Sequence, residues 1–385
     1  MKIVHLCLGA FFPDNYSYQE NMLPKFHKKM GYDVEVIASL ESFDQNGQTC
    51  YLSNSGYYIN ENGIKVCRLK YSFPEVINHR FKHYQGVYNA LCAANPDIIF
   101  IHNCQFTSMH SVVKYLKNKK NVKVYVDNHV DYSNSGKNWL SRNILHKILW
   151  KKISHTIEPY VTKFYGVLPA RVDWLINVYK LPKEKCELLV MGADDEKVLE
   201  AKQIEIKEFI RKKYKVNEDD FLIMTGGKID PWKTQTLLLM DAVANIKNSK
   251  VKLIVFGSVT PDLKEKINKH CINNKIQYIG WVDSAESYKY FASADLVVFP
   301  GRHSVFWEQV AGLGIPMLCK YWDGTTHIDL GGNVEFLTED SSSEIQNKIE
   351  NLINCPEKYK KMKEVASKKG MEVFSYRKIS ERAVS

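Results

Sequence analysis

Short apolar runs alternate with longer amphipathic stretches along the whole chain. Apolar runs of this kind are typical of strands buried on both faces, and their alternation with helical stretches is typical of parallel βαβ units. The pattern therefore predicts an α/β protein with two doubly wound parallel sheets. The predicted strands begin at Ile3, Val34, Ile98, Val122 and Phe164 in the first set, and at Glu187, Phe221, Val251, Ile276, Leu296 and Ile315 in the second.

A polar segment that begins at Met191, MGADDEKVLEAKQIEIK, separates the two sets of strands. It is charged enough to connect two domains, and 385 residues is a suitable length for two α/β domains. We therefore expect an N-terminal domain over residues 1–187 and a C-terminal domain over residues 188–365. Residues 366–385 have a helical period and are expected to pack back on the N-terminal domain.

Composition and charge narrow the classes of partner. Lys and Arg outnumber Asp and Glu by 53 to 43, giving a net charge of +10 that suits phosphorylated ligands or acidic lipids, or is simply a Lys-rich solvated surface. The basic residues are dispersed and no nucleic-acid motif accompanies them, which disfavours nucleic acid. The nine cysteines lack zinc spacing, and neither a signal peptide nor a membrane-spanning run is evident. We expect a cytoplasmic protein.

The first candidate site is the turn in TGGKIDPWKT, where Gly227 follows a predicted strand and Lys228 and Lys233 precede a helix. Glycine lets the backbone approach a ligand, and two ammonium groups near a helix start can neutralise a diphosphate. The alternative is a tight turn with solvated lysines.

The second candidate site follows the strand that ends at Phe299, where a helix is expected to open near Ser304. Ligands of open α/β sheets bind beyond the carboxyl ends of strands, so His303 and Ser304 are well placed. One turn later, Glu308 and Gln309 could accept hydrogen bonds from ribose or sugar hydroxyls. Adjacent helical positions point about 100° apart, so one of the two is expected at the surface.

Two further stretches carry polar or basic residues. Asp127, His129 and Asp131 follow a strand, where His129 could be a general base, a partner of a sugar hydroxyl or a loop residue satisfied by its neighbours. Their spacing does not suit zinc, so no metal site is predicted. The stretch NWLSRNILHKILWKKISHTIEP, which contains Trp139, predicts a basic amphipathic helix that lies on an anionic bilayer or packs on its own domain.

Taken in order, these stretches resemble glycosyltransferase family 4, of the type that builds bacterial cell-surface polysaccharides. The resemblance implies the GT-B fold, in which two Rossmann-like domains face a central cleft. GGKIDPWKT resembles the donor clamp of that family, with Lys228 at its Arg position and Lys233 at its Lys position. IQYIGWVD is similar to the segment that binds the base, which places Val282 against it. His129 matches the family histidine that contacts the donor sugar.

EQVAGLGIP resembles the family pattern Glu-Ala-x-Ala-x-Gly-x-Pro, with one departure. Most members carry two glutamates across this turn, whereas here Gln309 takes the place of the second and Glu308 stands one position early. His303 or Ser304 falls near the first, followed by Val305. The resemblance implies that this turn binds the donor, and it leaves the recognition of the sugar open.

The implied activity is transfer of a sugar, with retention, from a nucleoside diphosphate sugar, UDP-sugar first, to a saccharide or lipid-linked acceptor. No cofactor or metal is implied beyond this co-substrate, because Lys228 and Lys233 would stabilise the departing diphosphate. His129 would orient the sugar, and Glu308 would hold hydroxyls. The alternatives are an epimerase, a phosphorylase, or a catalytically inactive partner that binds sugar nucleotides or polysaccharide.

Overall fold

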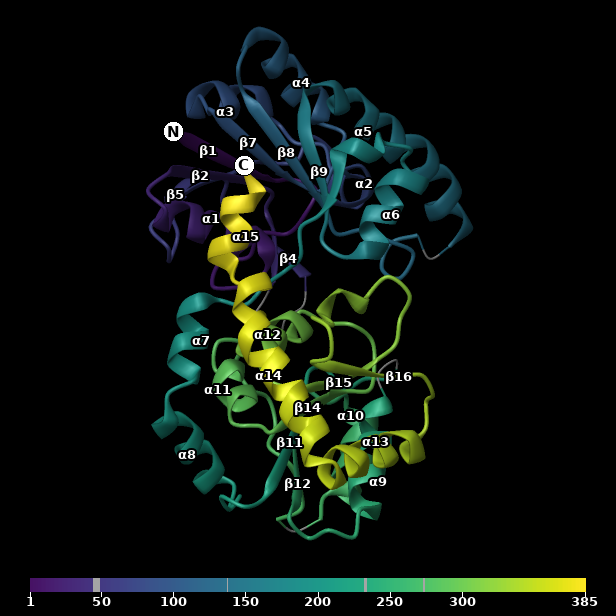
Figure 1. The fold of residues 1–385 in the computed structure, drawn as a ribbon. Helices are drawn as coiled ribbons and strands as arrows, with labels where there is room; N and C mark the ends of the chain where they lie inside the picture. The colour runs from purple at the N-terminus through teal and green to yellow at the C-terminus, as the bar shows by residue number, and fades with distance from the viewer. Residues whose placement is uncertain (44–48, 137, 232–233, 273) are drawn as a thin grey trace. The chain divides into compact units, whose positions relative to one another are not determined.

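The computed structural model describes residues 1–43, 49–136, 138–231, 234–272 and 274–385. The chain divides into two compact units, each built around its own parallel sheet (Figure 1). The N-terminal unit contains residues 1–190 and 379–385, and the C-terminal unit contains residues 191–378. Within the described ranges, no helix combines the length and the apolar character needed to cross a bilayer.

The sheet of the N-terminal unit has the strand order β10-β9-β8-β7-β1-β2-β6-β5, and only β5 runs antiparallel to its neighbour. The strand order reverses between β1 and β7. A short antiparallel pair, β3 and β4, lies outside this sheet. The strands are β1 Lys2–Cys7, β2 Asp33–Ala38, β3 Glu41–Phe43, β4 Thr49–Tyr51, β5 Gly56–Ile59, β6 Lys65–Arg68, β7 Ile98–His102, β8 Lys123–Asn128, β9 Val161–Gly166 and β10 Cys186–Leu188.

One face of this sheet is apolar and forms the main core with the helices that follow β6, β7 and β8. Residues at alternate positions of β1 and β7, such as Val4, Leu6 and Ile99, point into it because strand side chains alternate between faces. The helices of the unit are α1 Gln19–Lys29, α2 Glu75–Phe81, α3 Val87–Ala94, α4 Met109–Asn118, the π-helix η1 Ser141–Trp150, α5 Lys151–Ile157, α6 Pro169–Asn177, and the 3-10 turns η2 Glu158–Tyr160 and η3 Lys183–Lys185.

The C-terminal unit has a fully parallel sheet in the order β13-β12-β11-β14-β15-β16. Numbered within the unit, this is the Rossmann order 3-2-1-4-5-6, which reverses between β11 and β14. The strands are β11 Phe221–Gly226, β12 Val251–Phe256, β13 Ile276–Tyr278, β14 Leu296–Phe299, β15 Met317–Lys320 and β16 Val334–Leu337.

Helices cover both faces of this second sheet. On one face α9, α10 and α13 complete an apolar core, and on the other Phe256 and Phe299 pack against Phe291 and Trp307 of α11 and α12. The helices of the unit are α7 Asp195–Ala201, α8 Ile204–Lys213, α9 Gln235–Asn245, α10 Pro261–His270, α11 Ser287–Ala292, α12 Phe306–Leu313, the 3-10 turn η4 Thr326–Ile328, α13 Ser342–Asn354 and α14 Pro356–Val373. The last helix, α15 Tyr376–Ala383, begins in this unit and ends in the N-terminal one.

The end of the chain differs from the expectation that residues 366–385 pack on the N-terminal domain. The end of α14 stays in the C-terminal unit, where Ala193 bonds Phe374 and Tyr376 through its backbone. Only residues 379–385 belong to the N-terminal unit, where the carbonyls of Arg382 and Val384 accept hydrogen bonds from tyrosines of β9 and β8. The helical period of the sequence continues through this change of unit, so it could not locate it.

Candidate functional site

The carboxyl edge of the C-terminal sheet carries most of the predicted site residues. The strand order reverses between β11 and β14, and open α/β sheets bind ligands beyond the carboxyl ends of their strands at such a reversal. Gly227 and Lys228 follow β11, and His303, Ser304 and Val305 follow β14. The two candidate turns therefore flank the same position of one sheet.

The loops after β11, β12 and β13 are bonded to one another through glycines. Gly227 N donates to the Phe256 carbonyl at 3.1 Å, and Gly257 N donates to the Gly280 carbonyl at 2.7 Å. Gly227 and Gly257 have φ values of +130° and +129°, a region that favours glycine. A Cβ on Gly257 would lie 1.9 Å from the Gly227 carbonyl oxygen. The backbone beside the candidate diphosphate site is thus held by close glycine contacts.

Lys228 projects from this edge with 61% of its side chain exposed, 3.9 Å from the Asp230 carboxylate. An exposed cation in this place is free to meet an anionic ligand, because a surface pair at this distance is weak. The next residue, Ile229, is buried and its N–H donates to the Ser258 carbonyl. Lys233, the second predicted cation, lies outside the described residues.

The loop after β13 contains Val282, which is half-buried, beside the exposed Trp281. Gly280 with φ of +81° turns the chain at this point. Val282 is therefore on the same edge as Gly227, as the predicted contact with a base requires.

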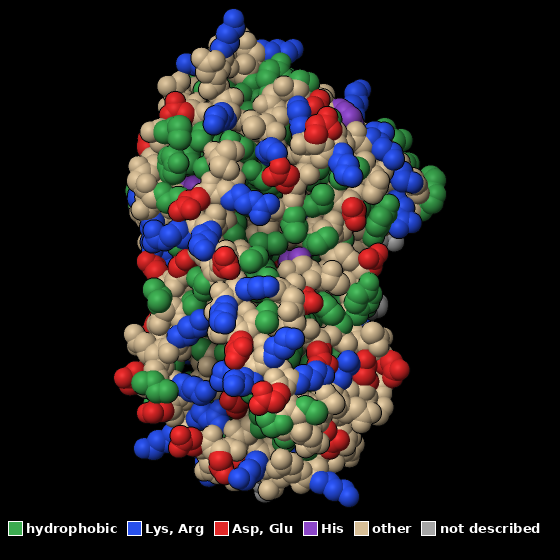
Figure 2. Space-filling model, viewed as in Figure 1, with side chains coloured by type: hydrophobic (Ala, Val, Ile, Leu, Met, Phe, Trp, Pro, Cys, Tyr) green, Lys and Arg blue, Asp and Glu red, His purple; other side chains and the backbone are tan. Residues whose placement is uncertain are grey.

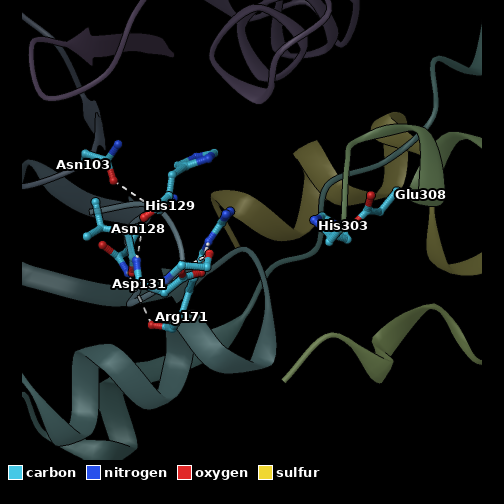
Figure 3. A network of polar contacts seen from close by, with 10 residues as sticks. Asn103, Asn128, His129, Asp131, Arg171, His303 and Glu308 are labelled. Carbon is cyan, nitrogen blue, oxygen red and sulfur yellow. Dashed lines mark hydrogen bonds and ion pairs between the residues drawn. The ribbon is translucent and has the colours of Figure 1, made fainter. Parts of the chain in front are cut away.

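His303 and Glu308 form a hydrogen-bonded group with a residue the sequence did not single out, His327 of η4 (Figure 3 shows His303 and Glu308). Glu308 Oε1 lies 2.7 Å from His303 Nε2 and 2.8 Å from His327 Nε2. Since a carboxylate can only accept, both imidazoles donate through Nε2. Ser304 and Val305 are half-buried and precede α12, which begins at Phe306 rather than near Ser304 as expected.

Glu308 is fully buried yet ionised. Burial alone would raise the pKa of its carboxyl group, but the charges and hydrogen bonds of His303 and His327 lower it to about 2. Glu308 Oε2 and His327 Nδ1 have no hydrogen-bond partner within the described ranges. A buried polar atom without a hydrogen bond is unfavourable, so a polar ligand or a water molecule that bonds to these two atoms would be stabilised.

The expectation that either Glu308 or Gln309 lies at the surface is wrong. Gln309 is buried as well, and its Oε1 has no hydrogen-bond partner among the described residues. The expectation assumed that α12 has an exposed face, whereas Trp307 to Leu313 are all buried because the helix packs against the sheet, α11 and α14. Both side chains therefore reach the interior of the C-terminal unit.

The N-terminal unit places His129 directly after β8, next to the buried carboxylate of Asp127 (Figure 3 shows His129). His129 Nε2 lies 3.3 Å from Asp127 Oδ2 and 3.8 Å from Glu20 Oε1 of α1. Burial opposes a charge on His129, but these two carboxylates prevail and raise its pKa. His129 is thus a partly buried, cation-forming side chain at the carboxyl edge of this sheet.

The three residues predicted as one group after β8 separate in the structure, where Asp131 lies beside Arg171 (Figure 3). Asp131 turns toward α6 and accepts a hydrogen bond from Arg171 Nε at 3.1 Å. The backbone of His129 is held by Asn103, whose side-chain oxygen accepts from its N–H at 2.8 Å. Asp131 therefore shapes the loop, while Asp127 is the acid that faces His129.

Two sets of three potential metal ligands have their ligand atoms within 4.8 Å of one another: Glu20, His102 and His129, and His303, Glu308 and His327. In the first set, both ring nitrogens of His102 are engaged in hydrogen bonds. In the second, the Glu308 oxygen is within hydrogen-bond distance of both imidazoles, so a cation would have to replace their N–H protons. Both arrangements fit hydrogen-bonded carboxylates better than occupied metal sites.

Comparison with known proteins adds a family match for the C-terminal unit. Residues 206–369 match the family model of "Glycosyl transferases group 1". This range includes the turn after β11 and the group around Glu308. No curated protein sequence matches the chain significantly. The match supports a glycosyltransferase.

Solved structures match almost the full length of the chain. A glycosyltransferase from Rickettsia africae has 17% identity and a TM-score of 0.68, with 99% of this chain and 96% of that one covered. Alr3699/HepE from Anabaena, in complex with UDP, has 15% identity and a TM-score of 0.66, with 99% and 98% covered. The fold is GT-B. The predicted fold class is thereby confirmed.

The GT-B fold also occurs in a different kind of enzyme. UDP-GlcNAc 2-epimerase from Neisseria meningitidis, bound to UDP-GlcNAc, has 14% identity and a TM-score of 0.65, with 100% of this chain and 99% of that one covered. At such identities the likeness concerns the fold alone, since one fold hosts several activities.

Proposed function

We propose that the protein is a retaining glycosyltransferase of family 4 that transfers a sugar from a UDP-sugar to an acceptor hydroxyl. The observation that carries this proposal is the family match over residues 206–369, which includes the Gly227 and Lys228 turn at the strand-order reversal. The UDP complex of the Anabaena relative supports UDP as the base-bearing group.

The chemistry follows from the charges of the two candidate turns. Lys228 and Lys233 stabilise the diphosphate as it departs, so no metal is needed. The departing phosphate oxygen takes the proton of the acceptor hydroxyl on the same face of the sugar. His129 orients the donor sugar, and the free oxygens of Glu308 and Gln309 accept hydrogen bonds from ribose or sugar hydroxyls. Val282 contacts the base, while His303, Ser304 and Val305 line the turn beside the sugar.

The test is transfer from UDP-glucose, UDP-GlcNAc and a GDP-sugar to saccharide and lipid-linked acceptors, with the anomeric configuration of the product determined. Lys233→Ala should lower turnover by roughly 10²-fold, because it removes a charge that meets the transition state. Lys250→Ala is the matched control, since this exposed lysine precedes β12 at the opposite edge of the sheet. Equal turnover of the two variants would contradict the role of Lys233.

An epimerase is the second candidate, favoured by the epimerase among the structures that share the fold. It would convert UDP-GlcNAc without an acceptor and would form no glycoside with one. A protein that only binds sugar nucleotides would instead raise its own melting temperature in their presence and form no product. Product analysis and thermal shift together separate the three activities.

We further propose that the acceptor is a lipid-linked or growing cell-surface saccharide, reached at the inner face of an anionic membrane. The helices after β8 support this, because they expose 71% of Trp139 and 61% of Ile148. Leu140 and Ile144 are also exposed, and Arg142, Lys147, Lys151 and Lys152 supply charge. Figure 2 shows hydrophobic and cationic side chains together at the edge of the N-terminal unit where these helices lie.

Binding to sedimented vesicles tests this surface. The protein should bind vesicles rich in phosphatidylserine more tightly than phosphatidylcholine vesicles, and salt should weaken the binding. Exchanging Trp139 and Ile148 for Ser should abolish it. Leu199→Ser is the control, because Leu199 of α7 is 73% exposed in the C-terminal unit. Equal binding of both variants would exclude these helices as the contact.

A further inference from the structure

The second face of the N-terminal sheet carries polar side chains where an apolar core would be usual. His5 of β1, His102 of β7 and Asp127 of β8 lie at positions that alternate with the apolar core residues of the same strands, and all three are fully buried. His27 of α1 and the C-terminal residues 379–385 cover them. Buried groups of this polarity persist only when each is hydrogen-bonded.

These groups form one continuous chain of hydrogen bonds. The Ser380 carbonyl lies 2.8 Å from His27 Nε2, and His27 Nδ1 lies 3.0 Å from His5 Nε2. His5 Nδ1 lies 3.0 Å from His102 Nε2, and His102 Nδ1 lies 2.7 Å from Asp127 Oδ2. Every ring nitrogen of the three histidines is therefore used.

This chain of hydrogen bonds needs more protons than its three histidines carry when they are neutral. Both ends, a carbonyl and a carboxylate, can only accept hydrogen bonds. The four contacts need four protons, whereas three neutral imidazoles supply only three. Without a fourth proton, two lone pairs would face each other within the buried chain. The chain must therefore hold one proton more than neutral histidines would.

The surroundings indicate where the extra proton lies. Burial lowers the pKa of His5 well below its ordinary value and that of His27 to about 4, so neither is charged at neutral pH. The remaining imidazole, His102, donates directly to Asp127. Burial opposes the charge on Asp127, but His102 and His129 lower the pKa of its carboxyl group nonetheless. A charged His102 with neutral His5 and His27 satisfies all four contacts.

We propose that His102 is doubly protonated and acts as a positioning residue that holds Asp127 ionised and oriented toward His129. Its consequence for turnover rests on the role proposed above for His129, whereas the proton itself does not. His5 stabilises the second proton of His102 by accepting a hydrogen bond from it. His5 in turn donates to His27, and His27 donates to the Ser380 carbonyl. That carbonyl belongs to the last turn of α15.

Other titratable groups face this chain and belong in any description of its charge. Glu20 faces His129 from α1, and Arg171 acts on His129 from α6. Tyr32 contacts the His27 ring, and burial raises the pKa of the Cys7 thiol, so that thiol stays neutral. His102 and His129 thus act on Asp127 directly, while Glu20 and Arg171 act on His129.

NMR of the full-length protein with isotope-labelled histidine tests the proton count directly, because the two ring nitrogens of an imidazolium differ from those of either neutral tautomer. We expect one buried imidazolium, assigned to His102 by its loss in His102→Gln, that persists at pH values where free histidine is neutral. His5 and His27 should both appear as neutral Nε2–H tautomers. Three neutral histidines, or a protonated His5, would overturn the proposal.

Two substitutions of His5 provide a second test. His5→Phe interrupts the chain and removes the need for the extra proton, whereas His5→Gln can accept from His102 and donate to His27. Between about pH 7 and 8, the unfolding constant of the wild type relative to His5→Phe should rise roughly tenfold per pH unit, because the native wild type binds one more proton. His5→Gln should follow the wild type. A pH-independent ratio for His5→Phe, or the same slope in His5→Gln as in His5→Phe, would overturn it.

Kinetics then separates the positioning role from the proposed function. If both hold, His5→Phe should lower kcat for UDP-sugar and shift its pH profile while leaving KM nearly unchanged, and His5→Gln should restore both. A retained imidazolium in a protein with no transferase activity would contradict the proposed function alone. Transferase activity with an unshifted profile in His5→Phe would contradict the positioning role alone.

Discussion

Each unit of the molecule buries one carboxylate between two histidines, but the two groups end differently. Asp127 lies against His102 and His129, and the bonding continues from His102 through two more imidazoles to a backbone carbonyl. Glu308 accepts from His303 and His327, and there the bonding stops at two buried atoms that have no partner in the described part of the chain. The hydrogen bonds that run from Asp127 through His102, His5 and His27 use every ring nitrogen of these three histidines, whereas the group around Glu308 has unused bonding capacity that a ligand can take up.

The comparison predicts that removing Asp127 mainly affects folding. Asp127→Ala leaves a buried imidazolium without its counter-charge, and we expect a loss of about 3 to 5 kcal/mol in the free energy of unfolding. Urea denaturation followed by hydrogen exchange of the N-terminal unit measures this loss. A matched change at Asp131, whose partner Arg171 is only partly buried, should cost less. A loss under about 1 kcal/mol for Asp127→Ala would mean that the chain of hydrogen-bonded histidines carries no buried charge.

On acidification, the N-terminal unit should lose stability at a higher pH than the C-terminal unit. In the N-terminal unit, His5 and His27 have lowered pKa values, so the stability that these two residues contribute is full above the unfolded value of about 6.5 and falls as the pH approaches about 4. With two protons taken up on unfolding, the slope near pH 5 is about 3 kcal/mol per pH unit.

The Glu308 carboxylate has a pKa lowered to about 2, so its contribution is present above the unfolded value of about 4.3 and disappears only as the pH falls through about 2. Hydrogen exchange at stepwise lower pH should therefore show the N-terminal unit opening first. Earlier opening of the C-terminal unit would contradict the contrast between the two groups.

The smallest change in stability, with a clear change in function, is expected for Glu308→Gln. The amide oxygen can still accept a hydrogen bond from an imidazole, so the substitution should lower the free energy of unfolding by only about 1 kcal/mol. Turnover should fall by roughly 10²-fold if the free carboxylate oxygen binds a donor hydroxyl, because the charge-assisted bond is lost. Steady-state kinetics with UDP-sugar measures it. Unchanged kcat/KM would show that the unused capacity of Glu308 serves no ligand.

The fold was predictable because its strands are nearly continuous apolar runs. IIFIH, from Ile98, is identical to β7, and the runs from Phe221 and Val251 begin β11 and β12. Parallel strands covered on both faces bury every side chain, so a sequence without gaps in hydrophobicity marks them. The change of unit at residue 379 left no such mark, since a helix can cross from one body to another without a change of period.

The candidate site was predictable only where its residues lie in one loop. Gly227 and His129 follow strands directly and His303 lies in the loop just after β14, so a search of the residues after each predicted strand finds them. His102 is the last residue of β7 and passed for part of a buried strand. His327 is 19 residues from Glu308 and meets it only through the packing of η4 on α12. Contacts of this kind depend on tertiary packing, which the local pattern of hydrophobic and polar residues does not reveal.

The close approach of Gly257 to the Gly227 carbonyl also bears on how this protein can change during evolution. Any side chain at Gly257 would collide with that carbonyl, so single substitutions there are closed to natural variation. The loop after β14 instead carries side chains at Ser304 and Val305, and both are half-buried. New donor preferences should therefore arise by drift in the loop after β14, while the glycine turns are inherited unchanged.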